Sequence, residues 1–271
     1  MTRNLDQYGL KSIVDNYDLF FIDIWGVIHN GIKLNSKAVK VLDNLTKKKK
    51  EFVLLTNAPR PNITVIDFLK NIGLKNYYKN IFTSGEAALK YLTKELKNKT
   101  FFHIGPPRDF DLFKNFKKFR VLNIEKSDYL LCSGLFEEHE NDEIYYKKIF
   151  KNQKLKKMIC TNPDLIVDRG NKRELCAGSV AKYFEEIGGE VVYFGKPYPP
   201  VYKLSANLEG KKILCIGDNL NTDIKGANVQ KFDSLLISSG IHRKEILNMQ
   251  FEDLHKHYNV KVNYMQTNLQ W

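Results

Sequence analysis

Three polar residues each end an apolar run of the kind that forms a buried strand. Asp23 ends DLFFID, Thr56 ends FVLLT and Asp218 ends ILCIGD. Unbroken apolar runs of this length are typical of strands buried on both faces of a parallel sheet. Open α/β sheets bind ligands beyond the carboxyl ends of their strands, so the three side chains are candidates for one site. Taken alone, each is equally well explained as a turn former or a helix cap.

The segments around these runs predict a doubly wound α/β core. Residues 18–56 form a βαβ pattern, with a helix expected over 36–50 and Ser36 as its N-cap. A second helix is expected around 63–72, with Gly73 as its C-terminal stop. Further apolar runs that predict core strands lie at 191–195, 213–218 and 234–238.

The middle of the chain predicts a separate α/β unit. Its strand candidates and its helix candidate lie at 100–105, 128–134, 156–162 and 140–150. We therefore expect a cap domain at 86–178, inserted between two parts of the core at 1–85 and 179–271.

Composition narrows the class of protein. The net charge is +12, but 36 of the 43 basic residues are lysines, and the arginines favoured for base recognition are few, so we expect no nucleic-acid partner. The longest apolar run, LFFIDIWGVI, is short for a membrane span and carries an Asp, which predicts no membrane association. The four cysteines show no zinc or redox spacing, so buried free thiols in the cytoplasm are expected.

Four segments in order, FFIDIWGVIHNG, LLTNAPR, GKPYPPVY and CIGDNLNTDIKGA, resemble the motifs of the haloacid dehalogenase-like (HAD) superfamily. TSGEAALKYL, TNPDLIVDRG and AGSVAKYFEEIGGEVVYFGKP extend the likeness to its class IIA subgroup. That subgroup carries a large α/β cap between the second and third motifs and includes nitrophenyl phosphatases, nucleotide phosphatases and pyridoxal phosphate phosphatases. The resemblance implies a small phosphorylated substrate and allows a homodimer through the cap.

The resemblance implies a magnesium site. Asp23 would act as nucleophile and as metal ligand, Trp25 would bind the metal through its main-chain carbonyl, and Asp218 would complete the protein ligands. Mg²⁺ suits such a set, because it prefers oxygen ligands and neutralises the repulsion between a carboxylate and a phosphate dianion. Asp223 would orient Lys196 or a water on the metal.

The resemblance also implies a phosphate site. Thr56 would hydrogen-bond the transferred phosphoryl group with help from the amide of Asn57, and Lys196 would share its charge between Asp23 and the phosphate. The residues taken one at a time leave other interpretations open. Asp218 and Asp223 are also suitable as caps of a helix near Thr222, Lys196 as a solvated lysine, and Thr56 as a cap.

One position departs from the commoner pattern. Most phosphatases of the superfamily have a second Asp two residues after the nucleophile, where it protonates the leaving group, and this chain has Trp25. His29 titrates in the right range to substitute, and a loop histidine packed near the cap hinge is the alternative. Arg60 is either a contact for an anionic substrate or an exposed residue at a helix start.

Together these features predict a cytoplasmic, magnesium-dependent phosphohydrolase that works through an aspartyl-phosphate on Asp23. Because of Trp25, two other functions stay open: a phosphate-binding or regulatory protein with weak turnover, and a phosphotransferase. Cap loops near 132–141 and 164–176 are the candidates for substrate choice.

Overall fold

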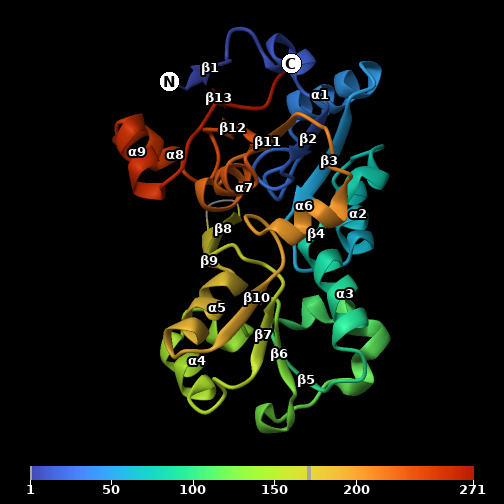
Figure 1. The fold of residues 1–271 in the computed structure, drawn as a ribbon, viewed down its shortest axis with the longest axis vertical. Coiled ribbons are helices and arrows are strands. Elements are labelled where there is room, and N and C mark those ends of the chain that lie inside the picture. The colour runs from blue at the N-terminus through green and yellow to red at the C-terminus, as the bar shows by residue number, and fades with distance from the viewer. Residues whose placement is uncertain (1, 170–171) are drawn as a thin grey trace. The chain divides into compact units, whose positions relative to one another are not determined.

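A computed structural model describes residues 2–169 and 172–271. The chain divides into two compact units. The first, here the core unit, comprises residues 1–56, 68–82 and 196–271, and the second, the inserted unit, comprises 57–67 and 83–195. In Figure 1 the blue start and the red end of the chain both belong to the core unit.

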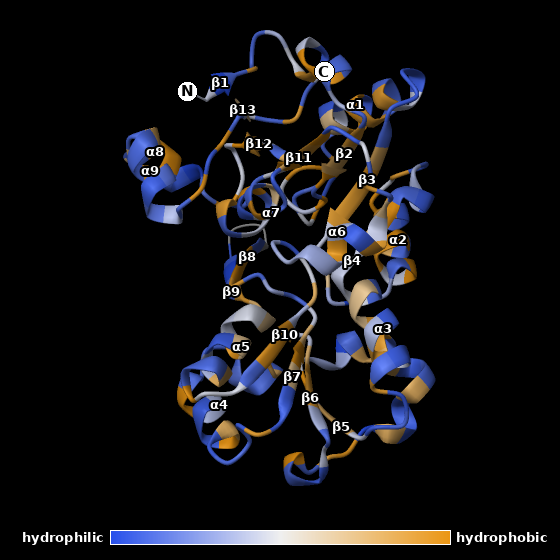
Figure 2. Ribbon diagram, in the orientation of Figure 1, coloured by the Kyte–Doolittle hydropathy of each residue, from blue (hydrophilic) through white to orange (hydrophobic). Residues whose placement is uncertain are grey.

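The core unit is built on a seven-stranded sheet with the order β1-β13-β12-β11-β2-β3-β4. Its strands are β1 (Arg3–Asn4), β2 (Leu19–Ile22), β3 (Glu51–Thr56), β4 (Ile81–Thr83), β11 (Ile213–Gly217), β12 (Asp233–Ile237) and β13 (Tyr264–Gln266). Every described pairing from β1 through to β3 is parallel. The central strands are apolar along their whole length in Figure 2, as expected of strands covered on both faces.

The helices of the core unit connect these strands. They are α1 (Ser36–Lys47), α2 (Asn62–Asn71), whose first turns count with the inserted unit, α6 (Pro199–Ser205), α7 (Lys225–Gln230), α8 (Arg243–Asn248) and α9 (Phe251–Tyr258). Gly73 follows α2 with a φ of 99°, the conformation of a C-terminal stop. The predicted N-cap of α1 was wrong by one residue. Asn35 is the cap, because its side-chain oxygen Oδ1 accepts hydrogen bonds from the main-chain amides of Lys37 and Ala38.

The inserted unit has a four-stranded sheet with the order β10-β7-β6-β5 and a separate two-stranded ribbon. The strands are β5 (Phe101–Ile104), β6 (Tyr129–Cys132), β7 (Lys157–Cys160) and β10 (Glu190–Tyr193), with β8 (Ile166–Arg169) and β9 (Lys172–Leu175) in the ribbon. Its helices are α3 (Ser84–Glu95), α4 (Glu143–Phe150) and α5 (Ala177–Glu186). Helices α4 and α5 pack on the sheet over a core that includes Tyr146, Phe150 and Phe184.

The sequence pattern predicted a core strand at 191–195, and this assignment to the core sheet was wrong. It forms β10, which pairs in parallel with β7, and Val191 lies opposite Met158. An apolar run predicts a buried strand but not the sheet to which the strand belongs. The main segment of the inserted unit runs from 83 to 195, with 57–67 added to it, whereas the predicted domain limits of 86 and 178 stay a prediction. The predicted specificity loop at 164–176 coincides with the β8–β9 ribbon, and its residues 170–171 lie outside the described residues.

The shorter helical turns complete the two units. The 3₁₀ turns are Leu10–Ser12, Val14–Asn16, Tyr78–Asn80, Pro107–Phe119, Ile124–Lys126 and Glu137–His139, and Leu220–Ile224 is a π-helical turn. The first and last strands, β1 and β13, pair with each other at one edge of the core sheet, and the chain then continues past β13 towards α1 (Figure 1). None of the described helices has the length and apolar character that crossing a membrane requires.

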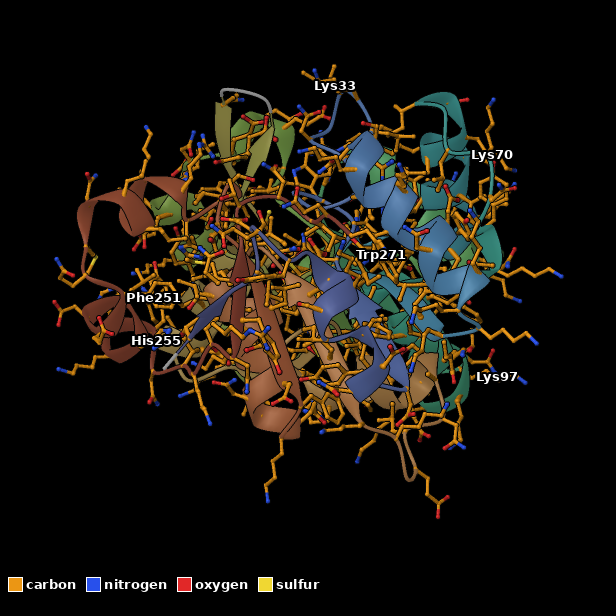
Figure 3. The ribbon with its side chains drawn as sticks, turned by 90° about the horizontal axis from the view of Figure 1, so that it is seen from above. Lys33, Lys70, Lys97, Phe251, His255 and Trp271 are labelled. Carbon is orange, nitrogen blue, oxygen red and sulfur yellow. The ribbon has the colours of Figure 1, made fainter. Side chains whose placement is uncertain are left out.

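The cysteine side chains are buried as predicted, and all four are free thiols. Lysines such as Lys33, Lys70 and Lys97 extend outward in Figure 3 and are exposed, whereas Lys196 is buried.

A buried polar chain runs through the inserted unit. Ser133 Oγ donates to Asp109 Oδ2 over 2.9 Å and lies 2.8 Å from His103 Nε2, and Asp109 Oδ1 accepts from Arg60 Nε at 3.0 Å. Since Ser133 donates its own proton to Asp109, its oxygen is an acceptor for an N–H at Nε2 of His103. Burial, with the nearby positive charge of Arg120, lowers the pKa of His103 to about 3.

His103 makes the stability of the protein depend on pH. Below pH 6.5 this histidine is protonated in the unfolded chain but not in the folded one. The free energy of unfolding therefore has its full value above that pH and decreases as the pH drops towards about 3. We expect His103→Gln to reduce the slope of unfolding free energy against pH, between 6 and 4, by about 1.4 kcal/mol per pH unit. Urea unfolding at several pH values measures this slope. The matched replacement of the exposed His257 should leave it unchanged, and equal slopes in all three proteins would contradict the assignment.

Candidate active site

A buried ammonium group joins two carboxylates at the centre of the site. Lys196 Nζ donates a hydrogen bond to Asp23 Oδ1 and a second, of 2.6 Å, to Asp223 Oδ1. Lys196 is 4% exposed, Asp23 7% and Asp223 4%, and lysine is rarely buried to this degree unless it is paired. The three residues come from three separate parts of the core unit: the end of β2, the segment before α6, and the π-helical turn after β11.

Topology explains why these residues meet. Strands β11, β2 and β3 are neighbours in that order and run parallel, so their carboxyl ends lie at one edge of the sheet. Asp23 follows β2, Thr56 ends β3 and Asp218 follows β11. The parallel register thus brings to one edge three side chains that are far apart in the sequence.

The carboxylates of Asp23, Asp218 and Asp223 lie close enough to hold a metal ion. One oxygen from each can be chosen so that all three lie within 4.8 Å of one another, and all three residues are buried. One lysine ammonium does not balance three carboxylates. The set therefore fits a divalent cation that prefers hard oxygen ligands.

The raised pKa of Asp23 also favours a bound cation at this site. Burial raises the pKa of Asp23 well above its ordinary range, and the charges of Asp223 and Asp218 raise it further, whereas Lys196 opposes the shift. A carboxylate must be ionised to attack phosphorus, so Asp23 needs more positive charge nearby than Lys196 alone supplies.

Glycines make the space around Asp218. A Cβ atom on Gly26 would lie 2.2 Å from Asp218 Oδ2, and a Cβ on Gly240 would lie 2.1 Å from the same atom. The main-chain N–H of Ile241 donates to this oxygen over 2.9 Å. The loop after β12 thus fixes Asp218 through its backbone, a contact for which side-chain types in the sequence gave no signal.

The predicted alternatives for Lys196, Asp218 and Asp223 have different outcomes. Lys196 is not solvated, because it is buried between carboxylates. Asp223 both binds a main-chain amide at the start of the turn and binds Lys196. Its Oδ2 accepts the N–H of Asn219, and its Oδ1 accepts from Lys196. Asp218 is held by Ile241 rather than placed as a cap of the turn, whose N-cap is Asn219.

Thr56 and Asn57 fall on either side of the division between the two units. Thr56 is buried at the end of β3, beside β2. Asn57, the next residue, donates from Nδ2 to Asp164 Oδ1 in the inserted unit over 3.1 Å. The phosphate-binding roles of both residues remain predictions.

Trp25 and His29 pack together in the loop after β2. The two ring centroids are 5.0 Å apart in an edge-on arrangement, and His29 makes a similar contact with Phe68 at 5.2 Å. His29 Nδ1 accepts the N–H of Gly31 over 2.8 Å, and burial lowers the pKa of His29 to about 4. The structure therefore supports the packed interpretation of this histidine over the acid. Arg60 is half-buried and its guanidinium binds Asp109, so it is not the freely exposed residue of the second interpretation; its contact with an anionic substrate stays a prediction.

Comparison with known proteins assigns the family. A haloacid dehalogenase-like hydrolase family model matches residues 20–117, and a HAD-hydrolase-like model matches residues 193–261. Together the two matches cover more than half of the chain and include Asp23, Thr56, Lys196, Asp218 and Asp223. The chain belongs to the haloacid dehalogenase-like hydrolases.

Relatives within this HAD family are named as phosphatases. The dihydroxyacetone phosphatase of Corynebacterium glutamicum is 26% identical over 82% of this chain and 81% of its own length. The 4-nitrophenylphosphatase of Schizosaccharomyces pombe is 23% identical over 87% of this chain and 88% of its own. A HAD-like hydrolase of Brucella suis, of known structure, superposes with a TM-score of 0.82 at 26% identity, covering 96% of this chain and 98% of that one. The capped HAD architecture predicted from the motifs is thereby confirmed.

Gly26 tests the packing around Asp218. Gly26 has a φ of 86° and Gly210 a φ of 69°, so alanine is strained at both positions, but open space surrounds only Gly210. We expect Gly210→Ala to lower the free energy of unfolding by about 1–2 kcal/mol. Gly26→Ala should cost about 1–3 kcal/mol more, because its methyl group displaces the Asp218 carboxylate. Urea denaturation of both variants measures the difference, and equal losses would show that Asp218 does not crowd Gly26.

Proposed function

We propose that this HAD hydrolase is a magnesium-dependent phosphatase of small phosphorylated metabolites, with Asp23 as its nucleophile. The observation that carries the proposal is the buried Lys196 ammonium bound to both Asp23 and Asp223, with Asp218 close by. An ion pair of this kind orients one carboxylate and leaves cationic charge where a phosphate dianion would enter.

In the first step an oxygen of the Asp23 carboxylate attacks phosphorus. The bond from phosphorus to the ester oxygen breaks, the leaving oxygen takes the electron pair and then a proton from solvent, and an aspartyl-phosphate forms. In the second step water attacks the same phosphorus and gives a proton to solvent, the bond from phosphorus to the Asp23 oxygen breaks, and inorganic phosphate leaves with the Asp23 carboxylate free. Lys196 stabilises the charge on the phosphoryl oxygens in both steps, and Asp223 holds Lys196 in place.

Asp23, Asp218 and the main-chain carbonyl of Trp25 are the groups that would hold Mg²⁺. The ion supplies positive charge that the three carboxylates lack and that lowers the repulsion between Asp23 and the phosphate. In this proposal Thr56 and the amide of Asn57 bind the phosphoryl oxygens.

Substrate size and surroundings follow from the relatives and the composition. Relatives named for dihydroxyacetone phosphate and nitrophenyl phosphate hydrolysis support a small phosphate ester rather than a macromolecule. Four buried free thiols support a reducing compartment, for which we propose the cytoplasm. A homodimer through the cap stays a prediction.

Asp23→Asn tests the nucleophile. The amide has nearly the shape of the carboxylate but cannot attack phosphorus, so turnover of 4-nitrophenyl phosphate should fall by about 10⁴-fold or more. Acid-quenched wild type should carry a phosphoryl group that hydroxylamine removes, and the variant should carry none. Asp15→Asn, at an exposed aspartate of the core unit, is the matched control.

The metal requirement is measured in the same assay. Wild type freed of metal by chelation should lose its turnover and regain it with Mg²⁺. Full activity in metal-free protein would refute the magnesium site, and a folded Asp23→Asn protein that still turns over would refute the covalent step.

Trp25 determines which leaving groups depart easily. Without a carboxylate at this position the rate should fall steeply as the pKa of the leaving alcohol rises, because alkoxides leave poorly without a proton. Trp25→Asp should speed alkyl phosphates by about two orders of magnitude and change nitrophenyl phosphate little. A series of phosphate esters of graded leaving-group pKa measures this dependence.

His29→Ala is the counter-test for Trp25. A packed, neutral imidazole predicts lower stability and an unchanged dependence on the leaving group. A steeper dependence in this variant would identify His29 as the acid. Wild type that binds phosphate tightly but releases none from any ester would instead favour the binding protein.

A further inference from the structure

Tyr202 is a buried tyrosine in the helix that follows Lys196. It lies on α6, is 1% exposed, and packs its ring edge-on against Phe21 and Phe232 at centroid distances of 5.2 and 6.0 Å. These contacts explain an aromatic ring at this position. They do not explain a hydroxyl group, because a phenylalanine would fill the same space.

The hydroxyl group of Tyr202 makes no hydrogen bond to any of the described residues. It lies against Gly226, where a Cβ atom would come within 2.0 Å of the hydroxyl oxygen. Buried hydroxyl groups nearly always have a partner, since leaving one unsatisfied costs its full desolvation energy. The oxygen of Tyr202 therefore needs a partner that is not a described protein group.

A small cavity beside the active site provides the place for one. Its polar lining comes from Tyr202, Lys196, Asp23 and Asp223, and its apolar lining from Phe21, Leu55, Cys215 and Ile216. The space is about that of one water molecule. A buried water requires two to four polar partners, and this lining offers a hydroxyl, an ammonium and two carboxylates.

The tyrosine is a suitable donor in this place. Burial, with nearby Cys215 and the charges of Asp223 and Asp23, raises the pKa of Tyr202 well above its ordinary range, so the phenol keeps its proton. A water that accepts a hydrogen bond from this phenol has both of its own hydrogens available to donate to the carboxylates.

We propose that Tyr202 is a positioning residue for the phosphatase site: its hydroxyl binds a buried water that hydrogen-bonds the carboxylates of Asp223 and Asp23 from behind. The water restrains both carboxylates that hold Lys196, and so keeps the ammonium aligned while charge moves between Asp23 and the phosphate. Tyr202 touches neither substrate nor metal in this arrangement. The role rests on the proposed mechanism at Asp23.

Tyr202→Phe removes the hydroxyl and keeps the ring. We expect kcat for 4-nitrophenyl phosphate to fall by up to about tenfold, the scale of one lost hydrogen bond to the water that restrains the carboxylates, with KM within about twofold. The thermal midpoint should fall or stay constant. Tyr146→Phe is the matched control, because Tyr146 is buried in the inserted unit and its oxygen accepts the Phe136 amide over 2.8 Å. It should lose stability and keep kcat.

A tyrosine without this role predicts the opposite pattern. Removing an unsatisfied hydroxyl would raise the thermal midpoint and leave kcat unchanged, and unchanged kcat in Tyr202→Phe overturns the proposal whatever the midpoint does. A high-resolution crystal structure gives the direct readout: an ordered water within hydrogen-bonding distance of Tyr202 Oη and a carboxylate oxygen supports it, and a cavity without water density overturns it. If Asp23→Asn is inactive and Tyr202→Phe is normal, only the role of Tyr202 fails; if Asp23→Asn is active, the covalent mechanism fails.

Discussion

The site depends on one buried ammonium group. Removing an ammonium from water is costly, and the hydrogen bonds from Lys196 to Asp23 and Asp223 offset that cost. The same bonds fix the nucleophile and its neighbour to one point. The strand end at Asp23, the segment at Lys196 and the turn at Asp223 must therefore keep their places, and the parallel sheet that carries β2 and β11 holds them there.

Crowding of negative charge is the second constraint. Asp218 joins the pair of carboxylates and is held by the backbone of Ile241, in a space that Gly26 and Gly240 leave open. Burial raises the pKa of Asp23, and the neighbouring carboxylates raise it further. The acidic cluster therefore fits a divalent cation on its own chemistry, independently of the family to which the chain belongs, and this agrees with the proposal for magnesium.

The loop after β2 bears on the proposed chemistry. By the resemblance, Trp25 lies where most phosphatases of the superfamily carry an acid; its ring packs on His29, and burial lowers the pKa of that histidine to about 4. The proposed binding of the metal by residue 25 needs only a main-chain carbonyl, which tryptophan also supplies. What the loop no longer offers among these residues is a carboxylic acid for the leaving group.

The sequence by itself determined the buried apolar strands, the order of the motifs and the identity of the polar residues at the strand ends, because burial period and residue type are local properties. Asp23, Thr56 and Asp218 were found in this way, and the α/β architecture with them. The short terminal strands and the β8–β9 ribbon were not predicted. Three features were decided only by tertiary structure. Strand β10 pairs with β7 in the inserted unit, although its apolar run resembles those of the core, because a pattern of burial does not specify a partner strand. His29 titrates in the useful range in an unfolded chain, and its depressed pKa arises from packing around the ring. The positions of Tyr202 beside Asp23 and Asp223 and of Ile241 beside Asp218 depend on chain segments that meet only after the sheet has formed, so no spacing in the sequence records them.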